Sequence, residues 1–193
     1  MSNTYLLTWN PDKWDFDGGY NTFLQSINVG QRPIEEWRAV NKSIQKGDVL
    51  YVMKLGKEPR GIILKGIALS GGHPSEHYDP EKAKAGETVN RVDVQFISAG
   101  DYTKGEFIDW KVLKERFPNQ NWTPQASGIR IQDEYCDELS ELWNHITNGV
   151  NVPMRPKNII KAADGSMRYV CGCCETSFVE NARCPECGQL VKA

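Results

Sequence analysis

Two apolar segments separated by a short polar turn dominate the pattern of the chain. Residues 49–55 and 62–69 are rich in β-branched and other apolar side chains, and the intervening residues 56–61 contain two glycines and a proline. This pattern predicts a β-hairpin. The second segment is apolar at both alternate sets of positions, as expected of a strand covered on both faces. We therefore expect the hairpin to form the buried centre of a sheet or barrel.

Shorter patterns on both sides of the hairpin predict further elements. Residues 5–9 form an apolar strand that turn-forming residues end, and residues 88–97 alternate between apolar and polar positions as a strand does. Helices are predicted over residues 21–30, 109–117 and 133–146, and the last has apolar residues at helical spacing. The glycines and proline of residues 71–78 predict a loop.

The length of the chain suits one main domain and a small appended module. The chain has 193 residues, and domains commonly run about 100 to 150 residues. Prolines, glycines and polar residues in the range 148–168 predict a linker between a domain at 1–147 and a module at 169–193. No stretch approaches the roughly 18 apolar residues that span a bilayer, and no charged-then-apolar leader is present. We therefore expect a soluble, cytoplasmic protein.

Positive charge is concentrated near the central hairpin, although the net charge of the chain is -2. The range 38–65 carries seven basic residues against two acidic ones, while acidic residues gather in the range 133–141. A basic strip on an acidic body could guide a phosphate backbone to one face. The same lysines could equally protect a solvated strand edge.

Cysteines are concentrated in the tail. Five of the six cysteines lie between positions 171 and 187, in two Cys-x2-Cys pairs with the spacing of a structural zinc site. Four thiolate ligands leave no open position for water, which predicts a structural rather than a catalytic Zn²⁺, and metal binding would supply the folding energy of so short a module. Cys173 could replace Cys174. The predicted ligands are Cys171, Cys174, Cys184 and Cys187.

Aromatic residues gather near the first predicted strand. Trp9 ends that strand, and Trp14 and Phe16 follow it, where we expect them to cap the core. Trp37 stands between charged neighbours, and the local sequence fits half-buried packing and the wall of a site equally well.

Two histidines, His73 and His77, lie in the predicted loop at 71–78. Their spacing does not place them on one face of a loop, and no third ligand lies nearby in the sequence. We therefore expect no metal site there.

Four features of residues 1–147 resemble the EVE domain, a PUA-like barrel related to the YTH readers of methylated adenine. They are the opening strand Tyr5-Leu6-Leu7-Thr8-Trp9-Asn10-Pro11, Trp37, Gly47-Asp48 with the Gly61-Ile62 hairpin, and Trp122-x-Pro124-x-x-Ser127-Gly128-Ile129. The resemblance implies an α+β fold, with a PUA-like mixed β-barrel flanked by helices, to which this chain adds the predicted C-terminal zinc ribbon.

The resemblance also implies a non-catalytic reader that takes a modified base out of its helix into an aromatic pocket. The places that build this pocket in the YTH relatives hold Trp9, Asn10, Trp37 and Tyr78 here. Stacking and hydrogen bonds to the base edge offset the cost of flipping. Arg38, Lys42 and Arg60 are the candidates for holding the flanking phosphates.

EVE domains resemble specificity modules of bacterial defence systems, in which modified cytosine in DNA is the proposed target. We hypothesise that this chain binds DNA containing methylated or hydroxymethylated cytosine. Modified RNA is an alternative ligand, and a further alternative is a specificity subunit for a modification-dependent nuclease. A nuclease in the chain itself is disfavoured because no histidine follows His145 to activate water. A structural adaptor whose aromatic residues are all core is the remaining alternative.

Overall fold

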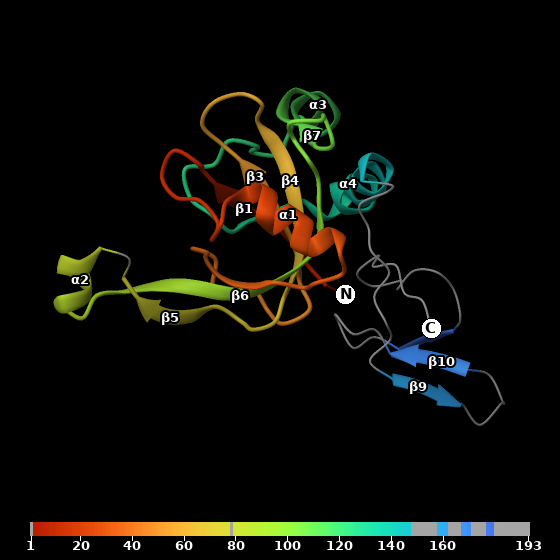
Figure 1. Cartoon of the computed structure of the whole chain (residues 1–193), viewed down its shortest axis with the longest axis horizontal. Coiled ribbons are helices and arrows are strands. Elements are labelled where there is room, and N and C mark those ends of the chain that lie inside the picture. The colour runs from red at the N-terminus through yellow and green to blue at the C-terminus, as the bar shows by residue number, and fades with distance from the viewer. Residues whose placement is uncertain (1, 78, 148–157, 162–166, 171–176, 180–193) are drawn as a thin grey trace.

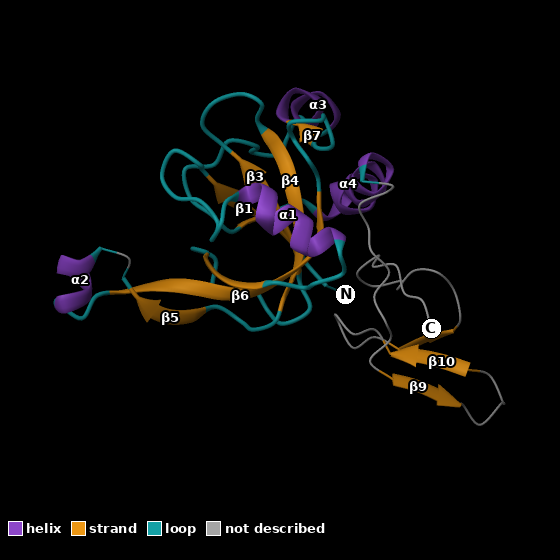
Figure 2. Cartoon of the chain, in the orientation of Figure 1, coloured by secondary structure: helices purple, strands orange, loops and turns teal. Residues whose placement is uncertain are grey.

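The computed structural model describes residues 2–77, 79–147, 158–161, 167–170 and 177–179 (Figure 1). Within these ranges the chain forms strands, four helices and connecting loops (Figure 2). The strands of the large sheet are β1 Thr4–Trp9, β2 Ile34–Arg38, β3 Val49–Lys54, β4 Gly61–Ala68, β5 His73–Glu76, β6 Thr88–Ala99, β7 Ile108–Asp109 and β8 Ile129–Arg130. The helices are α1 Tyr20–Asn28, α2 Pro80–Lys84, α3 Trp110–Arg116 and α4 Asp133–Ile146. A second, three-stranded sheet contains β9 Asn158–Lys161, β10 Met167–Val170 and β11 Ser177–Val179.

The predicted hairpin forms the centre of the large sheet. The sheet has eight strands in the order β2-β6-β4-β3-β1-β8, with β5 paired to β6 and β7 paired to β4. Strands β3 and β4 pair antiparallel, β1 joins β3 in parallel, and every residue of β3 and β4 is buried. The sheet is mixed and curled like part of a barrel (Figure 1). The hairpin prediction is confirmed.

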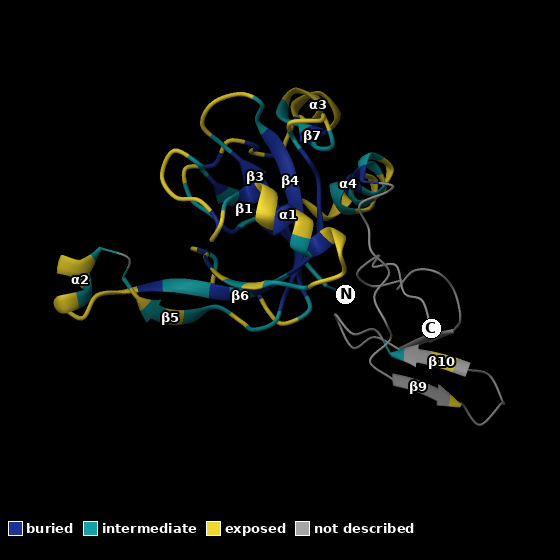
Figure 3. Ribbon diagram, viewed as in Figure 1, coloured by how far each residue is buried: buried dark blue, intermediate teal, exposed yellow. Residues whose placement is uncertain are grey.

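Alternation along the central strands divides the core into two clusters, one on each face of the sheet. Leu7, Val52 and Ile63 belong to one cluster, whereas their chain neighbours Leu6, Tyr51 and Ile62 belong to the other. The apolar side of α1 covers the first cluster, and residues of α3 and α4 cover the second (Figure 3). This arrangement explains why the hairpin is apolar at both sets of alternate positions.

Several predicted bounds hold closely. Helix α4 spans the predicted range 133–146, and β6 extends the predicted strand at 88–97 by two residues, to Ala99. The described residues contain no helix that is long and apolar enough to cross a membrane.

Two segments expected to lack regular structure contain strands. The range 71–78, predicted as a loop, contains β5, which pairs with the outer part of β6 although Pro74 lies within it. Proline is tolerated there because β5 pairs on one side only. The range 148–168, predicted as a linker, contains β9 and the first residues of β10, where Ile159 pairs with Tyr169. Adjacent β-branched residues in β9 favour a strand.

Candidate nucleic-acid interface

The C-terminal end of β1 carries an aromatic cluster that begins with Trp9. Trp9 is 1% exposed, and its ring stacks on Tyr20 of α1 with centroids 5.4 Å apart and an interplanar angle of 23°. Its indole Nε1 donates to the carbonyl oxygen of Trp14 at 3.1 Å. Phe16 lies 5.2 Å from the Trp9 ring and is also buried. The first strand, α1 and the loop between them therefore meet at Trp9.

Trp14 lies against both of the other tryptophans of this cluster. Its ring centroid is 5.1 Å from that of Trp37 and 6.3 Å from that of Trp9, and it meets both rings edge-on, at 67° and 70°. Trp37 is 4% exposed and packs on Phe96 of β6, whereas Trp14 is 44% exposed. We call Trp9, Trp14 and Trp37 the tryptophan triad. Trp14 is its solvent-facing member and is carried by a loop rather than a strand.

The loop that carries Trp14 is fixed at its start by Asn10. The Asn10 Oδ1 atom accepts from the backbone N–H of Asp12 at 3.0 Å, which closes a local turn. The loop between β3 and β4 packs closely on the same side chain, since a Cβ added to Gly56 would lie 2.7 Å from Asn10 Oδ1. Gly56 also has φ of +79°, which favours glycine. The amide oxygen of Asn10 is therefore engaged by its own turn.

The segment before β8 ties the ends of β1 and β2 together. The Ser127 Oγ atom accepts from the N–H of Thr8 at 3.1 Å, and the Ser127 carbonyl accepts from the N–H of Val40 at 2.8 Å. A Cβ on Gly128, whose φ is +92°, would lie 2.9 Å from the Cβ of Ala39. Three of the sequence features that resemble the EVE domain, around Trp9, Trp37 and Ser127, thus meet in space.

Two buried polar groups lie under the aromatic cluster. The Tyr20 hydroxyl lies 2.8 Å from the Gly100 carbonyl oxygen and 3.1 Å from that of Ile63, and burial raises its pKa well above the ordinary value. Lys54, which pairs with Trp9 across the strands, donates from Nζ to two carbonyl oxygens of the β3–β4 loop, and burial lowers its pKa. These bonds satisfy both buried polar groups beneath the cluster.

The structure brings three of the four predicted base-binding residues together. Trp9 and Trp37 both contact Trp14 and Phe16, and Asn10 directly follows Trp9. Both of these rings are covered, and Asn10 is half-buried. Tyr78 lies outside the described residues.

The predicted phosphate-binding residues lie in two different parts of the main domain. Arg38 ends β2, Lys42 follows it, and both are exposed. Arg60 is half-buried in the β3–β4 loop, where it pairs with Glu58 at 2.9 Å and stacks on Trp110 at 4.4 Å. Lys114 of α3 lies over the same Trp110 ring, 4.9 Å from its centroid.

The four predicted zinc ligands, Cys171, Cys174, Cys184 and Cys187, lie outside the described residues.

Trp14 is the candidate residue that sequence analysis placed in the core. The expectation that Phe16 caps the core is confirmed, but Trp14 is half-exposed. Phe16 also stands between charged residues, Asp15 and Asp17, so the local sequence carries no signal that separates the two rings.

No family model matches the sequence, and a search of curated proteins finds no match. Solved structures share the fold at low sequence identity. A hypothetical protein from Leishmania major superposes with a TM-score of 0.56 at 15% identity, covering 75% of this chain and 96% of its own. A protein from Pseudomonas syringae gives 0.52 at 16% identity, covering 72% and 99%. Human THYN1 protein, solved in complex with DNA containing 5-methylcytosine, gives 0.51 at 17% identity, covering 74% and 98%. The curled mixed sheet and its helices form an α+β fold that the chain shares with these structures.

Proposed function

We propose that this chain is an EVE-like, non-catalytic reader of modified bases that binds DNA containing modified cytosine. The observation that carries the proposal is the tryptophan triad at the end of β1, where a half-exposed ring covers two buried ones. Aromatic faces are the groups on which flipped bases stack. The shared fold with human THYN1, which was solved with DNA containing 5-methylcytosine, favours modified cytosine as the base.

The flipped base enters the triad by displacing Trp14. Trp9 and Trp37 are the walls, and the Trp14 ring occupies the space between them while the site is free. A base that replaces this ring exchanges one set of aromatic contacts for another, so the net cost of opening is small. Asn10 and Tyr78 contribute hydrogen bonding and a further ring in this proposal. The Asn10 amide nitrogen can donate, and its oxygen, which already accepts from Asp12, has a second lone pair.

Cations on either side of the triad hold the nucleic-acid backbone. Arg38 is the last residue of β2, the strand that carries Trp37, Lys42 lies in the segment after it, and both side chains are exposed. Arg60 contributes from the β3–β4 loop, whose Gly56 touches Asn10. Exposed cations bring affinity without sequence preference, so the preference for one base comes from the triad.

The deciding experiment compares duplexes that are identical except for one base. The full-length protein is titrated at fixed moderate salt with DNA containing cytosine, 5-methylcytosine, 5-hydroxymethylcytosine or N6-methyladenine, and with matched RNA. We expect a preference of at least tenfold, about 1.4 kcal/mol, for a modified cytosine in DNA. Uniform weak binding that added salt removes would overturn the proposal, because it would reflect phosphate contacts alone. A preference for modified RNA would overturn the assignment to DNA.

The tail is proposed to hold one structural Zn²⁺ through Cys171, Cys174, Cys184 and Cys187. Two Cys-x2-Cys pairs supply four thiolates, the donor set that a closed tetrahedral site requires. The pairing of Val170 with Ser177 joins β10 and β11 around residues 171–176, which contain the first pair. The module would add a nonspecific nucleic-acid contact or a contact with a protein partner.

Metal analysis of the purified chain tests this site. We expect bound zinc in the wild type and about one zinc per chain less in Cys184→Ser, because three thiolates no longer close the tetrahedron. Cys136→Ser is the matched control, since this thiol lies on α4 of the main domain. Equal zinc in the wild type and Cys184→Ser, or none in the wild type, would contradict the proposal.

A further inference from the structure

The outer face of the sheet carries a group of chemically active side chains on three neighbouring strands. Strand β6 lies between β2 and β5, and Glu36 of β2 stands directly opposite Asp93 of β6. His73 begins β5, opposite Arg91 of β6. Val92 and Val94 of β6 are buried on the inner face, so Arg91 and Asp93 project from the outer one.

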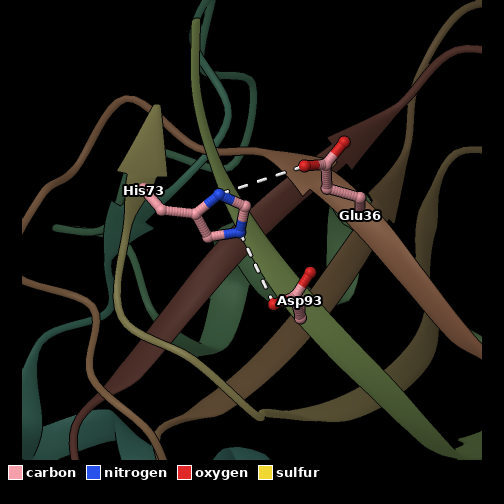
Figure 4. A group of neighbouring side chains, drawn as sticks. All are labelled: Glu36, His73 and Asp93. Atoms are coloured by element: carbon pink, nitrogen blue, oxygen red, sulfur yellow. Dashed lines mark ion pairs between the residues drawn. The ribbon is translucent and has the colours of Figure 1, made fainter. Parts of the chain in front are cut away.

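The imidazole of His73 lies between the two carboxylates (Figure 4). Its Nε2 atom is 3.5 Å from Asp93 Oδ2, and its Nδ1 atom is 4.0 Å from Glu36 Oε1. One ligand atom from each of the three residues lies within 4.8 Å of the other two. The side chains are 34% to 41% exposed, so the group lies at the surface of the sheet.

The charges of this group are incompletely balanced by the protein. Like charges directly opposite each other on paired strands are destabilising. Arg91 Nη1 lies 3.4 Å from Glu36 Oε2, which leaves Oε1 on the side of the imidazole. A neutral imidazole has one N–H and one lone pair, so only one carboxylate can accept a hydrogen bond from it. The Nε2 atom is itself covered from solvent and makes no hydrogen bond.

We propose that Glu36, His73 and Asp93 form a binding site for a divalent transition-metal ion. An ion between His73 Nε2 and Asp93 Oδ2 uses the unpaired nitrogen and offsets the repulsion between the carboxylates. Glu36 Oε1 lies on the other side of the ring, 4.0 Å from Nδ1, where it can accept from Nδ1–H and orient the imidazole toward the ion. One imidazole and one carboxylate as direct ligands suit Mn²⁺ and Zn²⁺ and leave positions for water.

Sequence analysis expected no metal site from His73 and His77, and the proposed site does not use that pair. His77 does not take part, since its Nδ1 accepts from the N–H of Asp79 at 2.9 Å. The third ligand that sequence analysis did not find near the histidines is supplied by strands that sheet pairing brings beside His73.

Mn²⁺ is the probe of choice for the test, because thiolates of the tail bind it poorly. The full chain is titrated with Mn²⁺ and followed by electron paramagnetic resonance, with circular dichroism as a check on folding. We expect one Mn²⁺ site with coupling to an imidazole nitrogen, and at least tenfold weaker binding in His73→Gln and Asp93→Asn. His145→Gln is the matched control, since His145 is exposed in the last turn of α4.

The test also separates the proposal from its alternative, an imidazolium that bridges the two carboxylates without metal. Absence of nitrogen coupling, or equal Mn²⁺ binding in wild type and His73→Gln, overturns the metal site. Glu36→Gln provides a second variant on another strand, and it should weaken Mn²⁺ binding without removing the nitrogen coupling. Loss of that coupling with Glu36→Gln would overturn the assignment of His73 as a direct ligand.

Discussion

Replacing Trp37 with alanine is expected to lower the free energy of unfolding by about 3 to 5 kcal/mol, the usual cost of removing a buried tryptophan. Trp37 is 4% exposed and contacts Trp14, Phe16 and Phe96, so its loss leaves a cavity between β2, β6 and the loop before α1. Chemical denaturation followed by circular dichroism measures the change. Small domains are stable by about 5 to 15 kcal/mol, which exceeds most of the expected loss. The variant should therefore remain folded near its temperature of maximum stability.

The same substitution is expected to abolish the preference for the modified base. One wall of the proposed site is gone, and a lost stack costs roughly 1 to 3 kcal/mol. Binding is measured at low temperature, where the folded fraction is first confirmed. Trp37→Phe keeps a ring in place and should lose less of both stability and preference. A folded Trp37→Ala variant that still prefers the modified duplex as the wild type does would exclude Trp37 from the site.

The central hairpin and α4 could be predicted because their signals are local. The hairpin has two apolar runs around a glycine and proline turn, and α4 has apolar residues at helical spacing. Strand β5 escaped prediction since a proline within a glycine-rich segment normally predicts a loop, and only pairing with β6 makes it a strand.

The candidate sites depend on tertiary contacts that local sequence patterns do not predict. Trp14 and Phe16 are two residues apart, but tertiary packing covers one ring and leaves the other half-exposed. The register of β2 and β6 places Glu36 opposite Asp93, although these two residues are more than 50 positions apart along the chain. Sequence analysis proposed Trp9 and Trp37 as base-binding residues only because the order of the sequence features resembles that of the EVE domain.

Replacing Trp14 with alanine is expected to tighten binding to the modified duplex, because the ring competes with the base for the space between Trp9 and Trp37. The variant loses three aromatic pairs, one with Phe16 and one with each of the two walls, Trp9 and Trp37. Each pair contributes about 0.5 to 1.5 kcal/mol. If the two pairs with the walls are lost from the free protein alone, affinity rises by up to about 1 to 3 kcal/mol, roughly fivefold to a hundredfold. Stability should fall by less than in Trp37→Ala, since Trp14 is 44% exposed.

Trp14→Ala and Trp37→Ala are titrated with the same duplexes. This comparison separates a base enclosed between Trp9 and Trp37 from a base that stacks on the surface of Trp14. Trp110→Ala is the matched control, since Trp110 is another half-buried tryptophan and lies on α3, outside the triad. It should leave the ratio of modified to unmodified affinity unchanged, even if the release of Arg60 alters both affinities together. A Trp14→Ala variant that binds the modified duplex tenfold more weakly would mean that the base stacks on Trp14 at the surface. Trp9 and Trp37 would then support that ring from below instead of enclosing the base.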